Sequence, residues 1–213
     1  GVKERLGKIV RSSPDKDIRG QAAVGVRCEK ERHRDTETRG QGDEGRRTRD
    51  EGRAGERQVL PPLIVINPVA RWITKLWSER KFAELADRLI QEKNAVIIFT
   101  GSADDRAVIG RIVLMMRRKA ENWAGETTLK EMAALASFSN LFITTDSGPM
   151  HLAAAAGAKV LALFGPTAPW RTCPYGESHI VVRKGLECSP CFQRKCDDVQ
   201  CMEAITVEEV MGQ

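Results

Sequence analysis

No stretch of this 213-residue chain approaches the run of about 20 apolar residues that a membrane-spanning helix requires. Residues 1–6 are charged and lead into no apolar signal core. Four of the six cysteines lie in the last 26 residues. Because nothing indicates secretion, we expect a reducing cytoplasmic environment, in which clustered cysteines bind metal or pack more often than they form disulfides.

Most of the chain carries almost no net charge, because its basic excess lies in the first 58 residues. Residues 1–58 carry 16 Lys and Arg against 12 Asp and Glu, whereas residues 59–213 carry 18 against 17. Over residues 27–58 the only apolar side chains are Cys28 and Ala54. Such a segment cannot bury enough surface to offset the entropy of ordering it, so we expect residues 1–58 to be disordered. Their composition also resembles that of an aberrant translation product.

The same segment lacks the features of a nucleic-acid-binding arm. Its acidic residues are interspersed with its basic ones almost one for one, so the field that would attract a phosphate backbone stays weak. No aromatic residue interrupts the run to stack on bases. We therefore expect no nucleic-acid partner.

The character of the sequence changes at Val59, after which short apolar runs alternate with amphipathic segments. Strands are predicted over residues 63–67, 95–99, 122–124, 141–144, 160–164 and 180–182. Helices are predicted over residues 78–93, 104–119, 128–137 and 149–156, with Ser78 as an N-cap, a capping box of Thr128 and Glu131, and Gly157 as a stop. This alternation predicts one α/β domain over residues 59–213, a Rossmann-like doubly wound parallel sheet.

The segment TTDSGPMHLA, residues 144–153, follows a predicted strand and opens a helix, where open α/β sheets bind ligands. Gly148 would let a phosphate approach the free N–H groups of the first helical turn. Ser147 and His151 could donate hydrogen bonds to that phosphate, whereas Asp146 would cap the helix or accept a sugar hydroxyl. An ordinary capped strand–turn–helix has the same composition, so the residues alone leave both interpretations open.

Several linked motifs resemble those of glycosyltransferase family 9, the ADP-heptose:lipopolysaccharide heptosyltransferases. The stretch TDSGPMHLAAA at residues 145–155, followed by LFGPT at residues 163–167, is similar to the signature of that family. The stretch NPVARWITKLW at residues 67–77 resembles the loop that carries a lysine for the sugar diphosphate. AGETTLKEM at residues 124–132 and the cysteine-rich tail are also similar to family features, so the resemblance covers about residues 63–210.

Members of this family are GT-B glycosyltransferases, with two Rossmann-like domains and an active site in the cleft between them. The resemblance implies that this chain corresponds to the C-terminal half, which binds the ADP-sugar donor. The N-terminal domain of the family binds the lipid-linked acceptor and supplies a carboxylate base. Residues 1–58 are too short and too polar to represent that domain, so we expect the acceptor half to be missing.

The resemblance also assigns roles to individual residues. Asp146, Ser147, Gly148 and His151 would hold the diphosphate and the transferred sugar. Lys75 would pair with the phosphates and steady the leaving ADP. Lys75, Asp146 and His151 are therefore the candidate catalytic residues, with no cofactor required beyond the donor itself.

Other residues near the predicted site carry more than one interpretation. Asp105 is a candidate partner for the ribose hydroxyls of the donor, or a solvated acid at the start of a helix. Arg71 and Thr74 are candidates to flank the phosphates, with a surface position the alternative for Arg71. Trp72 and Trp77 are expected to pack rather than to bind ligand.

The tail places four thiols within 14 residues, at Cys188, Cys191, Cys196 and Cys201. The opening C-x-x-C suits a tetrahedral zinc site, but the later spacings differ from those of common zinc fingers. We expect no metal here and keep structural zinc as the alternative, together with redox-labile or disulfide-bonded cysteines.

Taken together, the motifs predict a heptosyltransferase-type glycosyltransferase that transfers heptose from ADP-heptose, or sugar from a related nucleotide sugar, to the lipopolysaccharide inner core. The alternative is a catalytically silent module that binds ADP or an ADP-sugar, because no general base is found in the resembling half. A third hypothesis is an interaction module stabilised by metal in the cysteine tail. The expected location is the cytoplasm, with peripheral contact with the inner membrane left open.

Overall fold

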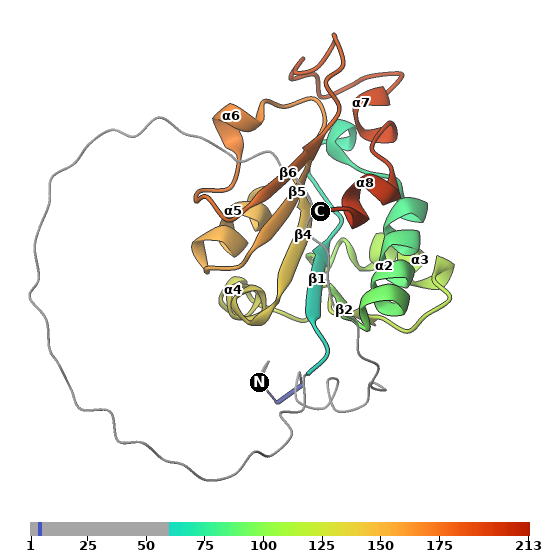
Figure 1. The fold of residues 1–213 in the computed structure, drawn as a ribbon, viewed down its shortest axis with the longest axis vertical. Helices are drawn as coiled ribbons and strands as arrows, with labels where there is room; N and C mark the ends of the chain where they lie inside the picture. Colours follow the sequence, from blue (N-terminus) through green and yellow to red (C-terminus); the bar gives the residue numbers. More distant parts are fainter. Residues whose placement is uncertain (1–3, 6–59) are drawn as a thin grey trace, which may run out of the picture.

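The computed structural model describes residues 4–5 and 60–213 (Figure 1). The prediction that residues 1–58 are disordered therefore falls outside the described residues, apart from Glu4 and Arg5. Within the described part of the chain, no helix is both long enough and apolar enough to cross a bilayer.

Six parallel strands form a single sheet in the order β3-β2-β1-β4-β5-β6. The strands are β1 Leu63–Asn67, β2 Val96–Phe99, β3 Glu121–Asn122, β4 Leu141–Thr145, β5 Val160–Phe164 and β6 Ile180–Arg183. The chain winds outward in one direction from β1 to β3 and in the other from β4 to β6, so the order reverses between β1 and β4. The predicted doubly wound Rossmann-like sheet is confirmed.

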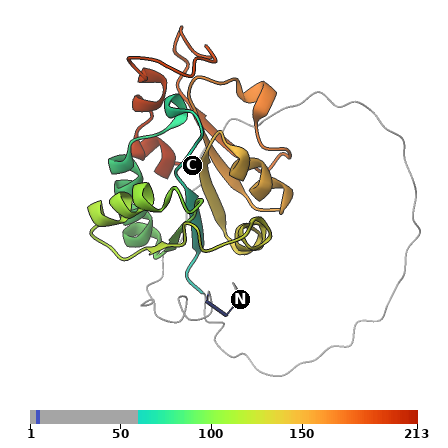
Figure 2. The ribbon, with the colours of Figure 1, turned by 180° about the vertical axis from the view of Figure 1, so that it is seen from behind.

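Helices cover both faces of the sheet, as Figures 1 and 2 show from opposite sides. One face carries α2 Glu79–Lys93, α3 Arg106–Met115 and α8 Val207–Met211, and the other carries α4 Leu129–Phe138 and α5 Gly148–Ala155. The short elements are a 3-10 turn η1 Ile73–Lys75, α6 Pro169–Thr172 and α7 Gln200–Glu203.

Strand β1 shows why the strands read as unbroken apolar runs in the sequence. Ile64 and Ile66 point into the core beneath α2 and α8, whereas Leu63 and Val65 point into the core beneath α4 and α5. All four side chains are buried because the sheet is covered on both sides. Because helices cover both faces, only the ends of the strands are left for a ligand to approach, and open α/β sheets use the carboxyl ends.

Helix α3 is shorter than the predicted range 104–119, and the reason is a carboxylate on α2. The helix ends at Met115, and Met116 is already extended. Asp87 accepts hydrogen bonds from the backbone N–H groups of Arg117 and Arg118, at 2.9 and 2.8 Å. These N–H groups would otherwise continue the helix, so their capture by Asp87 ends it early.

The predicted helix signals are confirmed in two of three cases. The Thr128 side chain accepts from the backbone N–H of Glu131, and Glu131 accepts from the backbone N–H of Thr128, which is a complete capping box. Gly157 follows α5 with φ of +83°, a left-handed conformation that glycine adopts without strain. Ser78 stands at the N-cap of α2, but its side chain makes no capping hydrogen bond.

The capping box also makes the stability of the start of α4 depend on pH. Hydrogen bonds from the backbone and the hydroxyl of Thr128 hold the pKa of Glu131 below its usual value. The stabilisation from these bonds is therefore present above the unfolded-state pKa and is lost as the pH falls through the folded-state pKa.

Replacing Thr128 with Ala should lower the free energy of unfolding by about 1 kcal/mol, because the N-cap bond to Glu131 is lost. Urea denaturation followed by circular dichroism measures the change. The matched control is Thr127→Ala, whose hydroxyl makes no hydrogen bond among residues 60–213 and should be near neutral. Equal losses in the two variants would contradict the capping assignment.

Candidate functional site

A cavity of about 280 Å³ opens where the strand order reverses, beyond the carboxyl ends of β1 and β4. Open α/β sheets bind their ligands at this topological switch point. The lining residues come from the loop after β1 and from the start of α5: Arg71, Trp72, Lys75, Asp146, Ser147, Gly148 and His151. All five residues to which the resemblance gave a role toward the diphosphate and sugar therefore lie around one cavity.

The start of α5 provides hydrogen-bond donors that face this cavity. Ser147 occupies the N-cap in an extended conformation, and its side chain makes no capping hydrogen bond. A Cβ atom built on Gly148 would meet no protein atom within 4 Å. Protein packing therefore does not require glycine at this position, whereas a ligand that approaches the helix N-terminus would need the open space.

Lys75 and Asp146 form the central ion pair of the cavity. The Lys75 Nζ lies 2.7 Å from Asp146 Oδ2 and 3.2 Å from the Asp146 carbonyl oxygen. Thr167, in the loop after β5, donates its hydroxyl to the same Oδ2 atom at 2.6 Å. The expectation that Asp146 caps the helix is wrong, because its carboxylate turns instead toward Lys75 and Thr167. In the described residues it fixes the position of the Lys75 ammonium group, and the alternative that it accepts a sugar hydroxyl stays a prediction.

Thr167 is a site residue that the sequence motifs did not single out. It stands in the LFGPT motif, but the motif alone assigned it no partner. Its position after β5, the strand next to β4, could have indicated a contact with Asp146, since the carboxyl ends of neighbouring parallel strands meet at one edge.

The two tryptophans behave differently from each other. Trp77 is buried as expected, in an edge-to-face contact with Phe82 at 4.9 Å between ring centroids. Trp72 lines the cavity, and the Lys75 Nζ lies 4.5 Å from its ring centroid. The interpretation of Trp72 as a packing residue was therefore incomplete, because its ring also braces the lysine at the site.

The remaining predicted residues divide into those at the cavity and those away from it. His151 and Arg71 line it with exposed side chains. Asp105 does not line it, and its carboxylate accepts hydrogen bonds from the backbone N–H and the hydroxyl of Ser102, at 2.8 and 2.6 Å. Thr74 is buried and donates to the carbonyl oxygen of Gln193 at 2.8 Å, so its hydroxyl is occupied.

The cysteine tail packs on the protein but does not present a preformed metal site. Cys201 is buried, and burial is the main reason that the pKa of its thiol is raised, with smaller contributions from Cys191, Cys188 and Cys196. Among residues 4–5 and 60–213, no three or more His, Cys, Asp or Glu side chains are grouped to hold a metal ion. The alternative of structural zinc remains a prediction for metal analysis of the purified chain.

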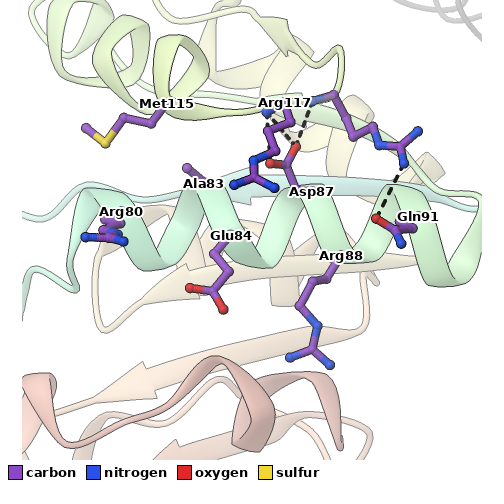
Figure 3. Close-up of a pocket in the computed structure, with 9 residues that line it drawn as sticks. Arg80, Ala83, Glu84, Asp87, Arg88, Gln91, Met115 and Arg117 are labelled. Atoms are coloured by element: carbon purple, nitrogen blue, oxygen red, sulfur yellow. Dashed lines mark hydrogen bonds between the residues drawn. The ribbon is translucent and has the colours of Figure 1, made fainter.

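A larger hollow of about 890 Å³ lies on the outer surface of α2, against the loop after α3 (Figure 3). Its walls are mostly charged side chains, and the hydrogen bonds of Asp87 to the backbone of Arg117 and Arg118 hold that loop in place. It extends along α2 from Arg80 to Gln91 and shares no lining residue with the cavity at the switch point. The smaller cavity is therefore the candidate functional site, since donors and a buried ion pair converge there.

Known proteins match this chain over the domain that carries the site. A family model described as glycosyltransferase family 9 (heptosyltransferase) matches residues 28–201. That match begins within the charged segment, upstream of the motifs that start at residue 63.

Individual relatives agree with the family match. Lipooligosaccharide heptosyltransferase 2 of Campylobacter jejuni serotype O:2 is 34% identical over 157 residues, which cover 71% of this chain and 49% of that protein. Lipopolysaccharide heptosyltransferase 3 of Escherichia coli K12 is 40% identical over 114 residues, covering 50% of this chain and 33% of that protein. The solved structure of E. coli ADP-heptose lps heptosyltransferase II is 30% identical, with a TM-score of 0.61, covering 71% of this chain and 44% of that one.

The chain thus spans about half the length, or less, of the curated relatives that it matches. The matched part includes the described sheet, the Lys75–Asp146 pair and the start of α5. Because the family model covers most of its length, the chain belongs to glycosyltransferase family 9, the heptosyltransferases.

Proposed function

We propose that residues 60–213 form the donor-binding part of a heptosyltransferase, which holds ADP-heptose or a related ADP-sugar for transfer to a lipopolysaccharide core. The observation that carries the proposal is the Lys75–Asp146 pair beside the uncapped N-terminus of α5. A lysine and a set of backbone N–H groups that converge on one cavity suit the diphosphate of a nucleotide sugar. The likeness to the E. coli ADP-heptose lps heptosyltransferase II supports this choice of donor.

In this proposal the domain stabilises the leaving group. Heptosyl transfer breaks the bond between the anomeric carbon and the diphosphate, and negative charge then develops on the diphosphate. Lys75 and the first N–H groups of α5 would meet that charge with donors that are already in place, so little reorganisation is needed. Asp146 and Thr167 keep the lysine aimed at the cavity, and His151 could donate a further hydrogen bond.

Activation of the acceptor needs a group that the cavity does not offer. Asp146 is the only carboxylate among the residues that line it, and its Oδ2 atom already accepts from Lys75 and Thr167. An acceptor hydroxyl needs a base placed to take its proton. We therefore assign the base to a residue outside this cavity.

The alternative function is a catalytically silent module that binds ADP or an ADP-sugar. The pairing of Asp146 with Lys75 favours it, because donor binding alone needs only the groups already present in the cavity. In both functions the nucleotide occupies the same site. The proposed location is the cytoplasm, where ADP-sugars would be available, with the lipid-linked acceptor presented at the inner membrane.

Removing either basic group from the cavity should weaken ADP binding. Lys75→Ala and His151→Ala are each expected to cost roughly 1–3 kcal/mol of binding free energy, the range for a hydrogen bond to a charged group. Calorimetric titration of ADP into the purified chain measures the loss. The matched control is Lys159→Ala, at an exposed lysine next to the amino end of β5, far along the strand from the cavity. This variant should bind ADP like wild type. A folded wild-type chain that binds no ADP would overturn the proposal.

The chain by itself should release no ADP in response to an acceptor. The expectation follows because Asp146, the carboxylate of the cavity, is already bound by Lys75. A coupled assay with ADP-heptose and a heptose-deficient lipopolysaccharide core measures the release. Acceptor-dependent turnover that disappears in Lys75→Ala would contradict the silent-module alternative and show that this chain supplies its own base.

A further inference from the structure

The cysteine-rich tail packs against the 3-10 turn that carries Lys75. The backbone carbonyl oxygen of Gln193 accepts a hydrogen bond from the hydroxyl of Thr74. Thr74 lies in the same 3-10 turn as Lys75. On its other side the tail is fastened to the loop after β5, where Pro166 accepts the backbone N–H groups of Cys191 and Phe192, at 3.1 and 2.8 Å. The tail therefore joins two of the loops that build the site, at the end of the molecule toward which β5 and β6 run (Figure 1).

Arg194 is the charged residue of the tail that contacts a wall of the cavity, because it lies against Trp72, one of the lining residues. Its guanidinium carbon lies 4.7 Å from the centroid of the Trp72 ring, the same ring that Lys75 approaches at 4.5 Å. Phe192 has a φ of +57°, a left-handed conformation that is rare for a bulky residue, two positions before the arginine. Such strained residues persist where the surrounding contacts over-determine them, and they cluster at ligand clamps.

The charges around Trp72 are unbalanced. Lys75 is neutralised by Asp146, whereas no carboxylate of the described residues lies within salt-bridge distance of Arg194. The charge of Arg194 is therefore the one that no described carboxylate balances, and an anion bound in the cavity would balance it. A diphosphate brings more negative charge than the Lys75–Asp146 pair can meet, because that pair is already close to neutral.

We propose that Arg194 binds the diphosphate of the nucleotide-sugar donor, which makes the cysteine-rich tail part of the donor site. The proposal rests on the proposed function, since it assumes that the diphosphate occupies the cavity beside Lys75. The planar guanidinium can present two parallel N–H groups to phosphate oxygens, and its contact with the Trp72 ring limits its freedom. Arg71, which also lines the cavity, has no comparable contact among residues 60–213 to fix it.

The test is calorimetric titration of ADP into wild type, Arg194→Gln and Arg194→Lys. Arg194→Gln should weaken ADP binding roughly 10-fold, because a charged hydrogen-bond donor is lost. Arg194→Lys should recover part of the affinity, since lysine restores the positive charge but cannot donate two parallel N–H hydrogen bonds. The matched control is Arg118→Gln, an exposed arginine at the hollow on α2, which should leave the affinity unchanged.

The outcomes separate this proposal from the one on which it rests. Wild-type affinity in Arg194→Gln, while Lys75→Ala is impaired, would overturn the role of Arg194 and leave the donor site standing. Absence of ADP binding in the folded wild-type chain would overturn both.

A second measurement needs no variant. ADP should slow tryptic cleavage after Arg194 more than cleavage after Arg117 or Arg118, as followed by mass spectrometry of the peptides. Equal protection at all three sites would also count against the proposal.

Discussion

The contact between Lys75 and Asp146 is the constraint on which the rest of the site depends. Asp146 is 5% exposed, and a carboxylate so deeply buried must be paired and hydrogen-bonded. Its partners come from the loop after β1 and the loop after β5, so one carboxylate links the loops that follow three neighbouring strands. The cavity lies where they meet, beside the N-terminus of α5. The geometry of the site is thus a consequence of how a buried charge is accommodated.

Charge balance explains why the site extends beyond this pair. Because Lys75 is paired with Asp146, the pair carries little net charge, and a diphosphate in the proposed site would need additional positive potential. The free N–H groups of α5 supply part of it. The exposed Arg71, and in our proposal Arg194, lie where they can supply more, and His151 can donate a hydrogen bond. The Trp72 ring contacts both Lys75 and Arg194, which accounts for an aromatic side chain at the wall of a polar cavity.

Much of the fold and part of the site can be predicted from the sequence because the signals are local. Buried parallel strands appear as apolar runs, Thr128 and Glu131 lie three residues apart, and the start of α5 is contiguous with β4. The missed features depend on contacts between distant residues. Lys75 and Asp146 are 71 residues apart, Thr74 and Gln193 are 119 apart, and the early end of α3 depends on a carboxylate of α2. Motif resemblance grouped Lys75 with Asp146, but it could not show that the two side chains are bonded to each other.

The most direct test of the proposed donor site is a crystal structure of this chain with ADP. We predict the diphosphate at the start of α5, with phosphate oxygens within hydrogen-bond distance of the Lys75 Nζ and of the backbone N–H of Gly148. We also predict that Asp146 stays bound to Lys75 and Thr167 and takes no direct part in holding phosphate. Nucleotide bound in the hollow on α2, or a diphosphate that touches neither Lys75 nor the start of α5, would contradict the proposed site.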